Sequence, residues 1–87
     1  MFSNYDIFKT SESVIERHYS HALSDIYNAR DAEKAFKAIL YHRGAMVAAY
    51  QCAKPYILPA ELFSLQKYVD HLDTQMQKEH QKCYPTK

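Results

Sequence analysis

The scarcity of glycine and proline is the feature that most limits what this chain can fold into. Its 87 residues include one glycine and three prolines, whereas β-hairpins and tight turns depend heavily on these two residue types. A chain with so little turn-forming material is expected to consist of a few long elements. We therefore predict an all-α fold.

The length allows a single domain with a thin core. A chain of this size buries roughly 60–65% of the surface that it exposes when unfolded, so association with another chain is a common source of extra stability. Hydrophobic residues make up 47% of the sequence and charged residues 24%, which is typical of a globular protein. We predict one helical domain over residues 1–82, including an irregular aromatic arm at 1–10, and a polar tail at 83–87.

Helical periodicity predicts three helices, at about residues 12–28, 32–53 and 59–79. Ser13 and Glu16 fit a capping box for the first helix, and Asp31 is the expected N-cap of the second. Pro55 should end the second helix, and Pro59 suits the first turn of the third.

The third predicted helix carries its apolar residues in steps that alternate between four and three, which is a heptad seam. The seam consists of Leu58, Leu62, Leu65, Val69, Leu72 and Met76. The second and third helices have similar lengths and a short connection, so they should form an antiparallel hairpin. We expect the first helix to pack across this hairpin and complete a three-helix bundle.

The stretch LYHRGAMVAAYQCAKP, Leu40 to Pro55, has no charge between Arg43 and Lys54. It also contains Gly44, although glycine costs about 1 kcal/mol relative to alanine inside a helix. Either the two other helices cover its small residues, or a second subunit does. We expect a homodimer, or docking on a larger protein, through the residues Gly44, Ala45, Ala48 and Cys52, together with Phe63 and Tyr68 on the third helix.

Arg43 is predicted to be a buried charge, because its helical-wheel position falls among apolar residues. A buried guanidinium must find a carboxylate, for which Asp25, Asp70 and Asp73 are candidates, unless the side chain extends to the rim or binds an anionic ligand. If it is buried, Arg43→Ala should cost about 3–5 kcal/mol, and a loss under about 1 kcal/mol would indicate exposure.

The sequence offers little for catalysis or metal binding. The only glycine lies within a helix, so there is no glycine-rich phosphate loop. Cys52 and Cys83 fit neither a disulfide framework nor a metal pair, and we expect reduced thiols, with Cys52 packed and Cys83 exposed. His18, His21 and Asp25 share one flank of a helix with a spacing that metal ligands can use, but a solvated flank has the same pattern. We predict no catalytic residue, metal or cofactor.

A nucleic-acid-binding regulator is the alternative function. Arg30, Lys34 and Lys37 cluster at the start of the second helix, although the net charge of the chain is only +1, far from the basic footprint of a dedicated nucleic-acid binder.

The sequence also indicates where the protein acts. No apolar run reaches the roughly 18 residues that a membrane span needs, and MFSNYDIFKT does not resemble a signal peptide. We therefore expect a small cytoplasmic interaction protein, such as an adaptor, inhibitor or regulator of the kind found in bacteria and phages, with no membrane partner.

Overall fold

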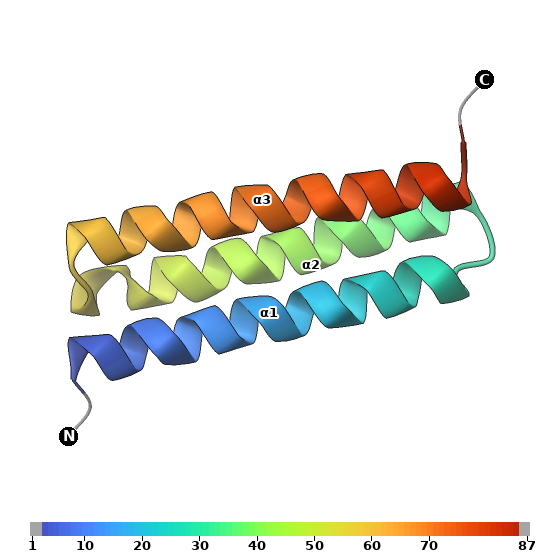
Figure 1. The fold of residues 1–87 in the computed structure, drawn as a ribbon. Helices are drawn as coiled ribbons and strands as arrows, with labels where there is room; N and C mark the ends of the chain where they lie inside the picture. Colours follow the sequence, from blue (N-terminus) through green and yellow to red (C-terminus); the bar gives the residue numbers. More distant parts are fainter. Residues whose placement is uncertain (1–2, 86–87) are drawn as a thin grey trace.

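The computed structural model describes residues 3–85, which form three long helices joined by short connections. The elements are α1 (Asn4–Asn28), α2 (Ala32–Ala53), the single 3-10 turn η1 (Lys54–Tyr56) and α3 (Pro59–Cys83). They run up, down and up in a rod of 49 × 20 × 14 Å, and each helix packs against the other two (Figure 1). The predicted all-α three-helix bundle and its antiparallel hairpin are therefore confirmed.

Side-chain caps fix where the helices begin. The Ser3 hydroxyl accepts a hydrogen bond from the backbone N–H of Asp6, and the Asp6 carboxylate accepts one from the N–H of Ser3, both at 3.1 Å. Asp31 caps α2 by accepting from the N–H of Lys34 at 2.9 Å. At α3, Glu61 accepts from the N–H of Leu58 at 2.9 Å. Each cap satisfies a donor that has no partner within its helix.

The core lies along the seam where the three helices meet. Its members, all at most 5% exposed, are Ile15, Ala22, Ile26, Ala35, Ile39, Met46, Leu65, Val69, Leu72 and Met76. The last four belong to the predicted heptad seam of α3. Leu58, the first residue of that predicted seam, is 56% exposed at the N-cap of α3.

The predicted aromatic arm is wrong over the described residues, because α1 begins at Asn4 and not near residue 12. The reciprocal Ser3–Asp6 cap starts the helix early, and the half-buried Phe8 then packs against the core as a helical residue. Residues 1–2 of the arm lie outside the described residues.

The polar tail also begins later than predicted. α3 continues to Cys83, and the half-buried Tyr84 donates a hydrogen bond to the carbonyl of Ala29 at 3.1 Å. The last turn of α3 is held in the same way, since the Nε2 of His80 donates to the carbonyl of Ala32 at 3.0 Å. Residues 86–87 of the predicted tail lie outside the described residues.

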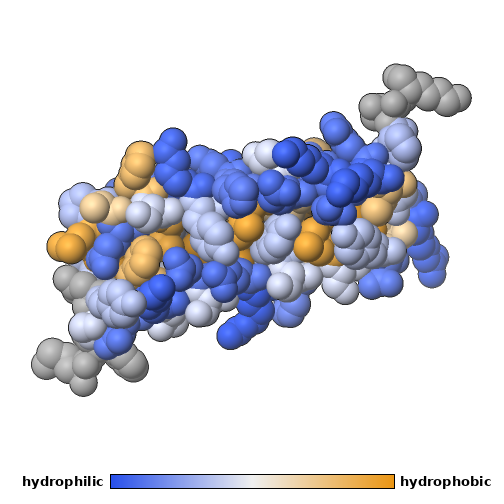
Figure 2. All heavy atoms as spheres, in the orientation of Figure 1, coloured by the Kyte–Doolittle hydropathy of each residue, from blue (hydrophilic) through white to orange (hydrophobic). Residues whose placement is uncertain are grey.

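One long face of the rod is mostly hydrophilic (Figure 2). Hydrophobic atoms on this face form a broken line along the bundle and gather near the end where α2 leads into α3. Tyr56 and Phe63, at that end of the chain path, are 59% and 58% exposed.

Candidate interaction surface

The outer face of α2 is an exposed, uncharged surface in a helix that is otherwise part of the core. We define this outer face by six exposed residues, Leu40, Tyr41, Gly44, Ala48, Gln51 and Cys52. Leu40 is 53% exposed and Tyr41 is 69% exposed. Over about three helical turns this side of α2 presents uncharged, mostly apolar or small side chains to solvent, where a surface helix normally carries charged ones.

Gly44 lies at the centre of this face, and no side chain from the other helices in residues 3–85 packs against the position of its missing Cβ. A Cβ atom placed on Gly44 would meet nothing within 4 Å. The neighbouring helices therefore do not cover the Gly44–Ala48–Cys52 side, so the first of the two interpretations of the small residues is wrong. Cys52 is exposed, contrary to the packed position that we predicted, while Ala45 is half-buried.

The two α3 residues predicted to bind a partner differ in exposure and in their contacts. Phe63 is 58% exposed, and the ammonium of Lys67 lies 5.3 Å from its ring centroid. Tyr68 is half-buried and donates a hydrogen bond to the Glu16 carboxylate of α1 at 2.9 Å. Burial, assisted by this hydrogen bond, raises the pKa of Tyr68 to about 12. Tyr68 therefore connects α3 to α1 within the bundle.

Arg43 is not buried, which corrects the sequence prediction. Its side chain is 46% exposed, and its Nε forms an ion pair with the carboxylate of Asp73, 3.3 Å away. Asp73 is one of the three partners that we considered. The adjacent residue, His42, occupies the buried position instead, at 5% exposed.

His42 joins α2 to α1 through both of its ring nitrogens. Its Nε2–H donates to the Asp25 carboxylate at 2.8 Å, and its Nδ1 lies 3.1 Å from the Nδ1 of His18. When His42 is neutral and Nε2 carries the proton, Nδ1 is an acceptor, so the Nδ1–H of His18 must donate to it. The neutral pair thus satisfies both nitrogens of a buried ring.

The environment of His18 favours its neutral form. Burial lowers the pKa of His18, and the electrostatic contributions of His42, His21 and Arg17 lower it further. Within residues 3–85 no set of three or more His, Cys, Asp or Glu side chains is arranged to hold a metal ion. We read this histidine cluster as a polar contact between helices, in which Asp25 orients His42.

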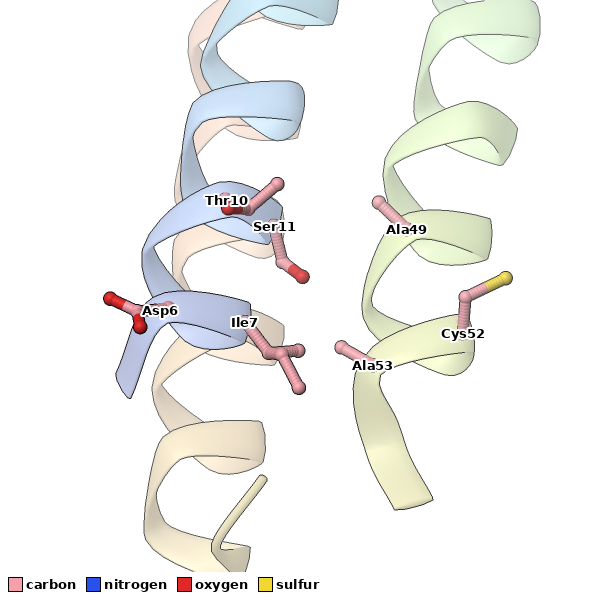
Figure 3. A pocket seen from close by; sticks show the side chains of 7 residues that line it. All are labelled: Asp6, Ile7, Thr10, Ser11, Ala49, Cys52 and Ala53. Atoms are coloured by element: carbon pink, nitrogen blue, oxygen red, sulfur yellow. The ribbon is translucent and has the colours of Figure 1, made fainter. Parts of the chain in front are cut away.

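A shallow groove opens between the first turns of α1 and the last turns of α2 (Figure 3). It is lined by Asp6, Ile7, Thr10, Ser11, Ala49, Cys52 and Ala53, with a volume of about 270 Å³. Ile7 and Ser11 point across it toward α2, and Ala49 points back toward α1. The volume is below the roughly 300–1,000 Å³ of small-molecule sites, so the groove suits one inserted side chain.

The basic residues of the alternative function are exposed but mixed with acidic ones. Arg30, Lys34 and Lys37 all face solvent near the start of α2. Lys37 pairs with Glu33 at 3.3 Å, and Asp31 caps the same turn. The local positive charge is therefore partly neutralised.

The sequence reasoning missed His42 and the groove. A signal for His42 was present, because Ala35, Ile39, His42 and Met46 follow core spacing in steps of four, three and four. The groove depends on how far apart two helices lie, which has no equivalent signal in the sequence.

Comparison with known proteins gives no relative from which a function could be transferred. No protein-family model matches the chain, and no curated protein or solved structure matches it either. None of the helices in the described part of the chain has the length and apolar character required to cross a bilayer.

Proposed function

We propose that this chain is a helical protein–protein interaction protein, an adaptor, inhibitor or regulator without catalysis of its own, that binds through the outer face of α2. The observation that carries the proposal is the solvent exposure of Leu40, Tyr41 and Gly44 on one uncharged side of a core helix. Contiguous apolar surface of this kind is typical of sites that another protein covers.

Gly44 adds an independent argument. A helical glycine costs about 1 kcal/mol relative to alanine, and no close contact at the Cβ position among the described residues offsets that cost. Close approach of a second helix is a physical reason to keep glycine here, because a missing Cβ lets two backbones come together.

A charge placed on the outer face tests the proposal. Affinity purification from the native host with the unchanged chain would first identify a protein partner. Ala48→Arg should then abolish binding of that partner. Gln66→Arg, on an exposed position of α3, introduces the same charge elsewhere and should leave binding intact. Thermal melts would check that both variants fold. Equal partner binding by the two variants would contradict the proposal.

Nucleic-acid binding remains the alternative, based on the exposure of Arg30, Lys34 and Lys37. If it is correct, the affinity for a labelled polynucleotide should fall steeply as salt increases, because bound cations are released from phosphates. Replacing Lys34 by glutamate should then reduce binding. No binding at low salt would exclude this function.

A further inference from the structure

We infer that a second copy of this chain occupies the outer face of α2, with the two α2 helices antiparallel about a two-fold axis at Gly44. The inference rests on the proposed function, because it assumes that this face is an interaction surface and then identifies the partner. The arguments come from side-chain size, the groove and the distribution of charge.

Size is the first argument. In an antiparallel pair centred on Gly44, a residue that precedes Gly44 lies opposite one that follows it by the same distance. Leu40, which is 53% exposed, then lies opposite the small Ala48, and Tyr41 lies opposite the half-buried Val47. The two Gly44 residues meet at the axis, where the absence of side chains permits the closest contact. The outer face is therefore complementary to itself.

The groove is the second argument. Helical side chains lean toward the N-terminus of their own helix, so Tyr41 of one copy extends past Val47 of the other, toward Ala49 and Cys52. These two residues, together with Ala53, form the α2 wall of the 270 Å³ groove. The exposed phenol ring of one copy thus has a cavity in the other, with the buried Ser11 on the opposite wall.

Charge is the third argument, and it selects the orientation. Glu33 is exposed on the first turn of α2, where it also pairs with Lys37 at 3.3 Å, and Lys54 is exposed just after the last turn. Lys54 makes no salt bridge among the described residues. The antiparallel pair places Glu33 of each copy level with Pro55 of the other and therefore near Lys54, whereas a parallel pair would place like charges together. Lys34 is level with Lys54 of the other copy, but the two point about 160° apart around α2, so they lie on opposite edges of the contact.

Charge reversal tests this pairing by sedimentation equilibrium of the full chain. Glu33→Lys and Lys54→Glu should each weaken self-association by about fivefold, since each creates two like-charge contacts per dimer in place of two exposed ion pairs. The double variant should recover most of the lost affinity, and so should an equimolar mixture of the two single variants. Additive losses without recovery would overturn the antiparallel pairing.

Cross-linking tests the position of the axis. In a chain with Cys52→Ser and Cys83→Ser, Gly44→Cys should form a disulfide-linked dimer under mild oxidation, because the two-fold axis brings residue 44 next to its copy. The structure has room for this side chain. Gln66→Cys, on exposed α3, is the matched control and should remain monomeric. Equal yields from both variants would place the interface elsewhere and overturn the inference.

The failure of this inference can be distinguished from failure of the proposed function. A chain that stays monomeric at several hundred micromolar overturns the homodimer. If Ala48→Arg nevertheless abolishes binding of a host protein, the outer face is an interaction surface for a different partner, and the proposed function stands.

Discussion

The inner face of α2 contains His42, a polar ring that is 5% exposed, whereas the outer face contains Leu40 and Tyr41, which are 53% and 69% exposed. At these three positions α2 departs from an ordinary amphipathic helix, which buries apolar side chains and exposes polar ones. The inner polar group is fully explained within the chain, because Asp25 and His18 satisfy both of its nitrogens. The outer apolar groups have no such explanation within the part of the chain that the structure describes.

This difference shows how to separate structural residues from candidates for binding. A buried polar side chain with all its partners present contributes to the bundle, and losing a partner would cost free energy. An exposed apolar side chain contributes little to the stability of the single chain. Mutations on the two faces of α2 should therefore affect different measurements, and five predictions test this.

The largest effect should come from Ile39→Ala, compared with Leu40→Ala one position along. Ile39 is fully buried, so its truncation should reduce the free energy of unfolding by about 3 kcal/mol. Leu40→Ala should change it by less than about 0.5 kcal/mol. Urea denaturation at low protein concentration measures both. Similar losses for the two variants would mean that Leu40 is not on an open surface.

His42→Ala should have the next largest effect, a loss of about 2 kcal/mol from two hydrogen bonds and the packing of the ring. The Asp25 side chain is 55% exposed and stays hydrated, which limits the cost. His42→Leu restores volume without the hydrogen bonds and should recover only part of the loss. Full recovery by leucine in urea melts would show that the hydrogen bonds contribute nothing net.

Gly44→Ala should change stability in the other direction. Because an added methyl group meets no neighbour, the better helix propensity of alanine should stabilise the monomer by about 0.5–1 kcal/mol. Urea melts at a concentration where the chain is monomeric measure this. A loss of stability would reveal a contact within the chain at Gly44.

Arg43→Ala should cost only about 0.5–1 kcal/mol, because the Arg43–Asp73 pair is partly exposed and screened by solvent. This is well below the 3–5 kcal/mol expected for a buried arginine. Asp73→Asn should produce a similar change, and a double-mutant cycle would measure the coupling. A loss above about 3 kcal/mol would show that the pair is shielded from solvent.

The smallest effect should be a pH dependence from His18. Its pKa is lowered in the folded chain, first by burial and then by His42, His21 and Arg17. Between that pKa and the unfolded value near 6.5, the unfolded chain binds more protons. The contribution of His18 is therefore complete above about pH 6.5 and is lost as the pH falls through its folded pKa.

Urea melts at about pH 7.5 and about pH 5 would measure this dependence. The informative quantity is the difference between the unchanged chain and His18→Gln, which should have the smaller loss. His71→Gln, at an exposed position of α3, is the control and should behave like the unchanged chain.

The sequence predicted the bounds of α2 correctly because both ends carry local signals. Asp31 caps the first turn and Pro55 follows the last residue, and the helix spans Ala32–Ala53 as expected. The start of α1 was missed because the Ser3–Asp6 cap lies among aromatic residues that we assigned to an arm. Local capping chemistry can be read from sequence, provided that the correct cap is chosen.

The direction of the core on α2 was harder to predict. Successive helical residues point about 100° apart. A modest error in the assumed direction of the buried side of α2 therefore assigned the buried position to Arg43 when His42 occupies it. Phe36 and Leu40 look like core residues but are 43% and 53% exposed. Which side of a helix is buried depends on where its two neighbours lie, and this is a tertiary property.

The histidine contact between α1 and α2 also has a consequence for the specificity of the fold. A seam of aliphatic side chains tolerates sliding of one helix past the other, because many registers bury similar apolar surface. A shift of α2 by one turn would separate His42 from Asp25 and His18 and leave an unsatisfied ring among apolar side chains, which costs about 1–3 kcal/mol. This polar contact therefore favours a single alignment of the two helices.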